Sequence, residues 1–196
     1  MIKLFFRLAL VAVCCAAFVS ADEAVNPALR PPKGSQLAIV VFEDLQCPRC
    51  RHDAPLVKQA AATYKIPVVR HDFPLPMHNW SYDAAVIAHY FDSRSKELGI
   101  AFRDYIFDHQ LEIYPANLRE FANKFAVEHK VDLPFVVDPQ GKFAAEVNAD
   151  RDLGKTLNLQ HTPTIYIVSS KPHGKPYVEV TDDTQLYQMI DAMKAE

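Results

Sequence analysis

The sequence lacks the features that would place it among nucleic-acid-binding or membrane-spanning proteins. Its 21 lysines and arginines are outnumbered by 24 aspartates and glutamates, which gives a formal net charge of −3. A protein with this balance has no basic surface with which to hold a phosphate backbone. Beyond residue 21 the chain has no apolar run long enough to cross a membrane, and it has no internal repeats. We therefore expect one domain with a real core and no nucleic-acid partner.

The first 21 residues have the pattern of a signal peptide. A basic start, Lys3 and Arg7, precedes an apolar run at Leu8–Ala21, which is 14 residues long and ends on small side chains. A membrane-spanning helix needs about 18 or more apolar residues, so an uncleaved membrane anchor is the less favoured alternative. Cleavage before Asp22 leaves 175 residues (196 − 21) and, with both basic residues removed, a net charge of −5. We predict a protein that is periplasmic or otherwise exported.

Cysteine is scarce, and half of it lies in the predicted signal peptide. A lipid anchor at Cys14 or Cys15 is disfavoured, because the residue before each is not the small one that such a site needs. The mature chain keeps only Cys47 and Cys50. Exported proteins use disulfides mainly to close long loops, and a bridge across two intervening residues constrains the unfolded chain little. A purely structural disulfide is therefore less favoured than a chemical role for this pair.

The chain around the cysteine pair alternates between strand and helix patterns. Residues 22–36 are polar and contain three prolines, which predicts an extended lead-in. The apolar run Leu37–Phe42 has the length of a strand buried on both faces, and helical spacing follows at Val57–Tyr64. A second short strand is predicted at Val68–Phe73. Strand, helix and strand in this space predict a parallel βαβ unit.

Residues 80–159 show helical patterns alone. Their apolar residues recur at helical spacing in three groups: Leu98, Phe102, Tyr105 and Ile106; Leu118, Phe121, Ala122 and Phe125; Phe143, Val147, Leu153 and Leu157. Asn117 and Glu120 are placed as a capping pair for the second group, and Asp138-Pro139 can start the third helix. We expect these aromatic stripes to form a core and not a cofactor site.

After residue 160 the pattern returns to strands. Thr164–Val168 and Tyr177–Val180 have strand character, and a final helix is predicted from Leu186 to Met193. The predicted fold is a mixed α/β domain, residues 37–79 and 160–196, interrupted by a helical domain at residues 80–159.

The sequence Cys47-Pro48-Arg49-Cys50 directly follows a predicted strand and opens a predicted helix. Disulfide exchange requires a thiolate, and a free cysteine is mostly protonated at neutral pH. Unpaired N–H groups and the positive dipole end at a helix N-terminus lower the pKa of a cysteine there. Pro48 suits the first helical turn, and Arg49 adds a positive charge. We predict Cys47 as the nucleophile and leaving group, Cys50 as the resolving thiol, and no cofactor besides their redox-active disulfide.

Other uses of two closely spaced cysteines fit less well. Covalent haem attachment needs histidine directly after the second cysteine, where this chain has Arg51. A closed zinc site needs two further ligands, and only His52 is near, so no metal site is predicted. Copper(I) can be held by two thiolates alone, which leaves a copper-binding protein or metallochaperone as the alternative from another functional class.

Four ordered segments resemble the DsbA-like thiol–disulfide oxidoreductases, a family within the thioredoxin superfamily. The segments are Val40–Cys50, Arg70–His78, Gly141–Val147 and Thr162-Pro163-Thr164. The similarity covers about residues 36–194 and implies a thioredoxin fold with a helical insertion, in agreement with the predicted order of elements. It also implies that Pro163 is a cis-proline beside the Cys47 sulfur. Thr162 would then tune that sulfur and leave its backbone free to pair with an extended substrate peptide.

Two positions depart from this family. Relatives commonly carry a buried acid six residues before the first cysteine, where this chain has Val41. Either Glu43 or Asp44 replaces it in moving protons, through a water molecule, or no residue does. His161 stands where many relatives have glycine before Thr-Pro, and it either adds charge near the cysteines at low pH or is a tolerated surface residue.

The direction of electron flow follows from two further arguments. Stabilising the Cys47 thiolate favours the reduced form and makes the protein a stronger oxidant, and Pro48-Arg49 suits that role. Residues 22–36 are too few for the N-terminal dimerisation module that exported isomerases usually add. We therefore expect a monomeric oxidase that donates its disulfide to unfolded or partly folded exported proteins and is reoxidised by a membrane partner. The alternative within this class is a reductase of one exported client.

Overall fold

The structure is a computed structural model and describes residues 25–171 and 173–195, so the predicted signal peptide lies outside it. The elements in chain order are β1 (Leu37–Glu43), α1 (Pro48–Tyr64), β2 (Val68–Asp72), α2 (Ser81–Arg94), α3 (Lys96–Asp108), α4 (Leu118–Glu128), α5 (Lys142–Thr156), β3 (Thr164–Ser169), β4 (Tyr177–Glu179) and α6 (Leu186–Ala195). Short 3₁₀ turns lie at Pro27–Leu29 and Asp183–Gln185. Among the described residues, no helix combines the length and the apolar character that crossing a membrane requires.

The strands form one mixed sheet in the order β2-β1-β3-β4. β1 and β2 are parallel, as predicted for a βαβ unit, whereas β1 with β3 and β3 with β4 are antiparallel. Every residue of the central strand β1 is buried, in agreement with the prediction that both of its faces are covered. Phe42 pairs with His71 of β2 on one side and with Thr164 of β3 on the other.

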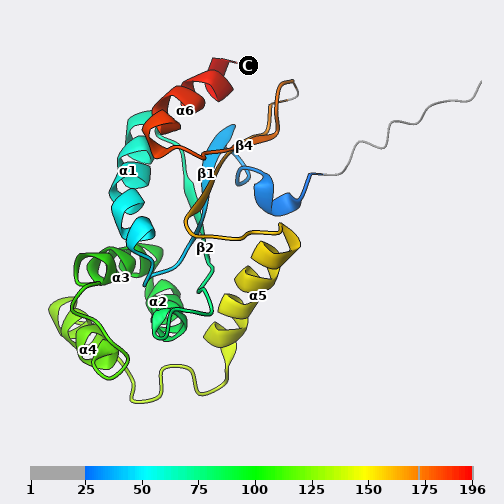
Figure 1. Ribbon diagram of the computed structural model, residues 1–196. Coiled ribbons are helices and arrows are strands. Elements are labelled where there is room, and N and C mark those ends of the chain that lie inside the picture. The colour runs from blue at the N-terminus through cyan, green and yellow to red at the C-terminus, as the bar shows by residue number, and fades with distance from the viewer. Residues whose placement is uncertain (1–24, 172, 196) are drawn as a thin grey trace, which may run out of the picture.

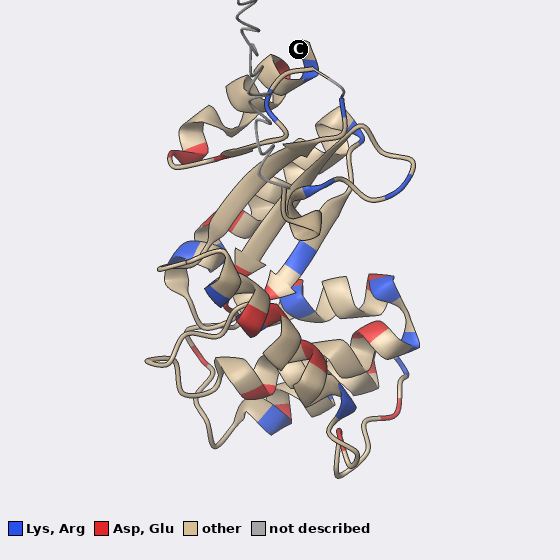
Figure 2. Ribbon diagram, turned by 90° about the vertical axis from the view of Figure 1, so that its right-hand side faces the viewer, with Lys and Arg blue, Asp and Glu red and all other residues tan. Residues whose placement is uncertain are grey.

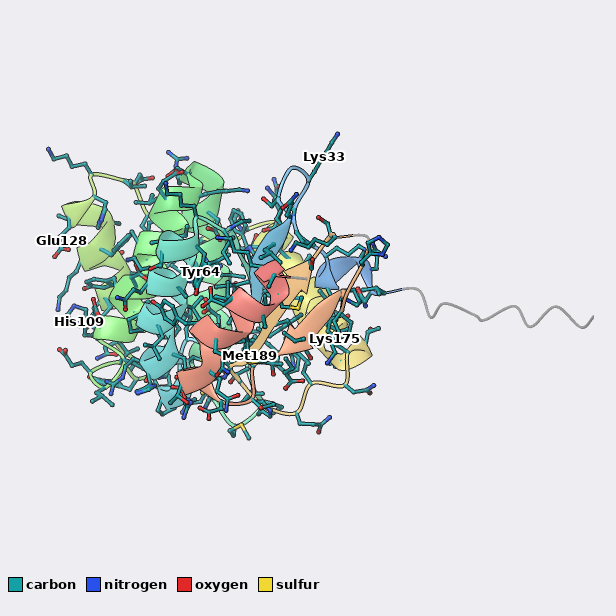
Figure 3. All side chains as sticks on the ribbon, turned by 90° about the horizontal axis from the view of Figure 1, so that it is seen from above. Lys33, Tyr64, His109, Glu128, Lys175 and Met189 are labelled. Carbon is teal, nitrogen blue, oxygen red and sulfur yellow. The ribbon has the colours of Figure 1, made fainter. Side chains whose placement is uncertain are left out.

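Alternation along β1 divides the sheet core into two layers. Leu37, Ile39 and Val41 face a cluster that includes residues of α1 and α6. Ala38, Val40 and Phe42 face the 3₁₀ turn at Pro27–Leu29 and the C-terminal part of α5. Figure 1 shows α1 and α6 on one side of the sheet and α5 on the other. In the view from above, α6 lies against α1, where Tyr64 Oη donates to the carbonyl oxygen of Tyr187 over 3.2 Å (Figure 3).

The helices between β2 and β3 have a core of their own, built from aromatic rings. Phe91 of α2, Phe102 of α3 and Phe125 of α4 are fully buried, with ring centroids 4.7–5.1 Å apart. The predicted apolar stripes of α3 and α4 therefore lie in this core, as expected. The same cluster extends to Cys47 and Cys50 at the start of α1. The packing of the helical insertion is thus continuous with the surroundings of the cysteine pair.

One predicted helix start was wrong, and one predicted helix-capping hydrogen bond is not formed. The third predicted helix begins at Lys142 and not at Asp138-Pro139, because Gly141 takes a left-handed conformation (φ 70°) that ends the preceding turn. Asp138 still serves this helix, since its carboxylate accepts a hydrogen bond from the Ala144 N–H over 2.8 Å. Asn117 precedes α4 as predicted but makes no side-chain cap bond. Its amide is used in the preceding loop, where it accepts from Tyr114 N–H over 2.8 Å.

Gly154 allows α5 to approach the sheet closely. A Cβ at this position would lie 2.5 Å from the ring of Phe73. We expect Gly154→Ala to lower the free energy of unfolding by about 1–3 kcal/mol, even though alanine favours helices, because the overlap outweighs the propensity gain of about 1 kcal/mol. Ala149→Gly at an exposed position of α5 is the matched control and should cost about 1 kcal/mol. Chemical denaturation measures both, and a more stable Gly154→Ala protein would contradict the close approach.

Candidate active site

The cysteine pair lies at the start of α1, and Figure 1 shows this end of the helix where the sheet meets the inserted helices. Cys47 is the N-cap of α1, with extended backbone, and Pro48 fills the first helical position, where its missing N–H leaves no bond unmade. Both cysteines are free thiols and buried, Cys47 being 7% and Cys50 2% exposed. The Cys47 Sγ lies 3.2 Å from the carbonyl oxygen of Thr162, to which it donates when it is protonated. The Thr162–Pro163 peptide bond is cis, so the loop before β3 reaches the sulfur across 115 residues of sequence.

The pKa values of the two thiols are shifted in opposite directions. The pKa of Cys47 is lowered to about 5, mainly because the Cys50 thiol donates a hydrogen bond to its sulfur. The Thr162 side chain and the backbone N–H groups of Cys50 and Arg49 lower it further. Burial acts against this lowering but is outweighed. The pKa of Cys50 is raised, first by burial and then by its interaction with Cys47. The arrangement therefore holds Cys47 as a thiolate and Cys50 as a thiol at neutral pH.

Arg49 acts on this sulfur through its backbone. Its guanidinium turns to two carboxylates, with Nε 2.9 Å from Asp53 Oδ2 and Nη2 2.9 Å from Asp183 Oδ1. The side chain is 54% exposed, so water screens what remains of its charge. The contribution of Arg49 to the lowered pKa of Cys47 comes from its backbone N–H group.

Asp44, one of the two candidate acids, organises the loop before Cys47. It is 1% exposed, and its Oδ1 accepts from Gln46 N–H over 2.7 Å. Its Oδ2 accepts from Leu75 N–H and lies 2.7 Å from His78 Nδ1. With both oxygens bound in this way, Asp44 is suited to holding the loop and not to carrying protons.

Glu43, the other candidate acid, faces Cys50. Both residues line a small cavity of about 10 Å³, which also touches Val41 and Pro163 and is about the space that one water molecule needs. Glu43 Oε2 accepts from Arg70 Nη1 over 2.6 Å, while Oε1 is buried without a hydrogen-bond partner. Burial raises the pKa of Glu43, and the Arg70 charge opposes that rise. A buried acid with a free oxygen beside a buried thiol can exchange a proton with it through one water.

His161 lies on the opposite, solvent-facing side of the cis peptide. It is exposed, and its Nδ1 is 3.2 Å from the carbonyl oxygen of Pro163. It lines an open groove of about 290 Å³ together with Arg49, Asp53 and Thr162. The ring contacts the backbone of the cis-proline loop, and no contact with either sulfur is seen among the described residues.

Two clusters of the described residues have metal-ligand spacing, and neither contains a cysteine. In the first, His52, Asp53 and Asp183, both carboxylates are already paired with Arg49. In the second, Asp72, His89 and Asp150, Arg103 Nη2 lies 2.7 Å from the Asp72 carboxylate. An arginine of the chain itself thus pairs with carboxylates of each cluster, and a copper site would rest on Cys47 and Cys50 alone.

Sequence reasoning missed two groups of residues around the pair. Arg70 and Arg103 flank Glu43, and Figure 2 shows basic and acidic residues side by side where the sheet meets the helices. Gln110, after α3, donates from its side chain to the carbonyl oxygens of Leu45 and Cys47. No local pattern reveals these contacts, because they join residues that are 27 to 65 positions apart.

Both the sequence and the fold are similar to those of known proteins. A family model described as thioredoxin matches residues 33–191. The chain belongs to the thioredoxin family. A curated relative, the Na(+)/H(+) antiporter NhaA 3 of Salinispora tropica, is 26% identical over 153 residues, which are 76% of this thioredoxin-family chain and only 22% of the antiporter.

Several solved structures share this fold at low sequence identity. The thiol-disulfide exchange protein alpha-DsbA2 of Wolbachia pipientis has a TM-score of 0.67 at 22% identity, covering 84% of this chain and 85% of that one. A periplasmic thioredoxin-like protein of Salmonella enterica serovar Typhimurium has a TM-score of 0.67 at 18% identity, with 88% and 94% covered. The catalytic domain of Proteus mirabilis ScsC has a TM-score of 0.66 at 18% identity, with 88% and 93% covered. The predicted thioredoxin fold and membership of the thioredoxin family are therefore confirmed.

The lowered pKa of Cys47 gives a direct test. We expect the alkylation rate of the reduced protein to titrate with a midpoint near pH 5, because only the thiolate reacts. Cys50→Ala should raise this midpoint, since it removes the hydrogen bond that contributes most. Arg49→Met should change it less, because the guanidinium is held by Asp53 and Asp183. A midpoint near 9, or one that Cys50→Ala leaves unchanged, would contradict this account of the site.

Proposed function

We propose that this protein is an exported oxidase that donates its Cys47–Cys50 disulfide to newly exported proteins. The observation that carries the proposal is the unequal pair of thiols beside the cis-proline loop, with the pKa of Cys47 lowered to about 5 and that of Cys50 raised. A low pKa makes a sulfur a good leaving group, and an oxidase needs Cys47 to leave last. The family and fold support exchange chemistry as such, and the direction is our inference from this asymmetry.

The exchange proceeds in two balanced steps. A client thiolate attacks the Cys47 sulfur of the disulfide; the Cys47–Cys50 bond breaks, and Cys50 departs and takes up a proton. The second client thiolate then attacks the client sulfur of the mixed disulfide, and Cys47 leaves as a thiolate. The client is oxidised by two electrons, and the pair is reduced to a thiol and a thiolate. A membrane partner reoxidises the pair, and the disulfide is the only redox group required.

Thr162 is proposed to hold the client. Its side chain is 7% exposed, while its carbonyl oxygen already meets the Cys47 thiol. An extended client segment can pair with the Thr162 backbone as an added strand, which brings a client cysteine to the Cys47 sulfur without demanding a particular sequence. A monomer suffices for this reaction, since the described residues supply both cysteines and the cis-proline loop.

Glu43 is proposed to give Cys50 its proton through the small cavity that both line. Glu43→Gln should slow client oxidation by about 10²-fold, near the lower end for general acid–base catalysis, and should abolish the dependence of the rate on the Glu43 pKa. The pH profile is the decisive measurement, because a variant that is merely destabilised would show the same dependence of the rate on pH as the parent protein. Glu97→Gln, at an exposed position in the first turn of α3, is the control. An unchanged pH profile for Glu43→Gln would remove Glu43 from the mechanism.

The reduction potential decides the direction of electron flow. At pH 7, lowering the pKa of Cys47 from its ordinary value of 9.0 to about 5 stabilises the reduced form by about 3 kcal/mol, which is equivalent to about 60 mV. We therefore expect a potential above thioredoxin's value of about −270 mV, measured against glutathione with the redox state trapped by alkylation. A value near about −120 mV supports the oxidase, and one near thioredoxin's supports a reductase. Failure to form the disulfide would favour copper binding by the two thiolates.

A further inference from the structure

The amide of Gln110 connects the helical insertion to the loop that carries the reactive cysteine. Gln110 follows α3 in sequence and is 5% exposed. Its Nε2 donates two hydrogen bonds, to the carbonyl oxygen of Leu45 over 2.8 Å and to that of Cys47 over 3.0 Å. One side chain thereby fixes the planes of the Leu45–Gln46 and Cys47–Pro48 peptides. No proton transfer or binding role for Gln110 is required to explain these contacts.

The Cys47 carbonyl is also the first acceptor of α1, since it receives the Arg51 N–H over 3.2 Å. Its orientation sets how the first turn of α1 lies relative to the Cys47 sulfur. The N–H groups of that turn help to lower the pKa of Cys47. A change in the direction of this carbonyl therefore moves the donors away from the thiolate that they stabilise.

The Gln110 side chain also destabilises the fold in a way that an apolar side chain would not. Gln110 Oε1 is buried without a hydrogen-bond partner. A buried amide with an unpaired oxygen destabilises the fold, so its value lies in the two bonds that the N–H₂ group makes. An apolar side chain of the same size would remove the unpaired oxygen but leave the Leu45 carbonyl without this donor.

From these contacts we infer that Gln110 is a positioning residue of the exchange reaction: by holding the Leu45 and Cys47 carbonyls, it keeps the first turn of α1 directed at the Cys47 sulfur and so sustains the thiolate. The inference rests on the proposed function only for its consequence in client oxidation. The effect on the Cys47 thiolate is a property of the reduced protein alone.

The test compares Gln110→Leu and Gln110→Glu with the parent protein. Gln110→Leu removes both donors at similar volume and should raise the pKa of Cys47 by about one unit, read from the ultraviolet absorbance of the thiolate. A tenfold loss in the equilibrium constant against glutathione should follow, which makes the potential about 30 mV more negative. Gln110→Glu keeps the shape but places carboxylate oxygens against two carbonyls, so above the pKa of the new carboxyl its effect should be at least as large. Protonation at low pH restores one donor and should diminish it.

The matched control is Gln59→Leu, at an exposed position of α1, which should change neither the pKa nor the potential. Thermal unfolding of the reduced proteins identifies folded variants, and Gln110→Glu keeps the test open if Gln110→Leu does not fold. Folded variants with an unaltered Cys47 pKa would overturn the inference and leave Gln110 a packing residue. If the parent exchanges no disulfide with clients, the proposed function fails, yet the absorbance titration still decides the role of Gln110.

Discussion

The site depends on the sulfur of Cys47 lying at the N-terminus of a helix. The first N–H groups of a helix have no partner within it, and an N-cap side chain normally accepts from one of them. Here the N-cap is Cys47, and the N–H groups of Arg49 and Cys50 stabilise its anion. These N–H groups stabilise a thiolate more than they stabilise the neutral sulfur of a disulfide. The helix therefore favours the reduced state, and the oxidised protein is driven to pass its disulfide on.

Buried charges fix how the insertion sits on the sheet. Arg103 of α3 is 4% exposed and lies 2.7 Å from Asp72 of β2 and 2.8 Å from Asp92 of α2. His89 of α2 adds a contact of 3.1 Å to the same Asp72 carboxylate. Burying such ions costs free energy, and removing one partner leaves an uncompensated charge, so the cluster specifies one arrangement more than it adds stability. That arrangement also places a cation beside Glu43, which limits how far burial raises its pKa.

What the sequence could predict was whatever depends on near neighbours in the chain. The strand of Leu37–Glu43, the helix opened by Pro48 and the α3 stripe around Phe102 all follow from patterns within one element. The start of α5 was misplaced because Gly141 and Asp138 compete as helix starts over four residues. Contacts such as those of Gln110 with the Cys47 loop are set by how α3 packs against α1. No spacing rule within one segment carries that information.

The helical insertion shields the cysteine pair from water, and this burial has two opposite effects on the pKa of a thiol. Burial alone raises the pKa of Cys47, as it does for Cys50, where it is the largest contribution. The same low-dielectric surroundings strengthen each hydrogen bond to the Cys47 sulfur. For Cys47 the hydrogen bonds prevail, the largest contribution coming from the Cys50 thiol, and for Cys50 burial prevails. The insertion therefore separates the two proton affinities further than the exposed start of a helix could, and this separation is what lets one thiol leave while the other holds its proton.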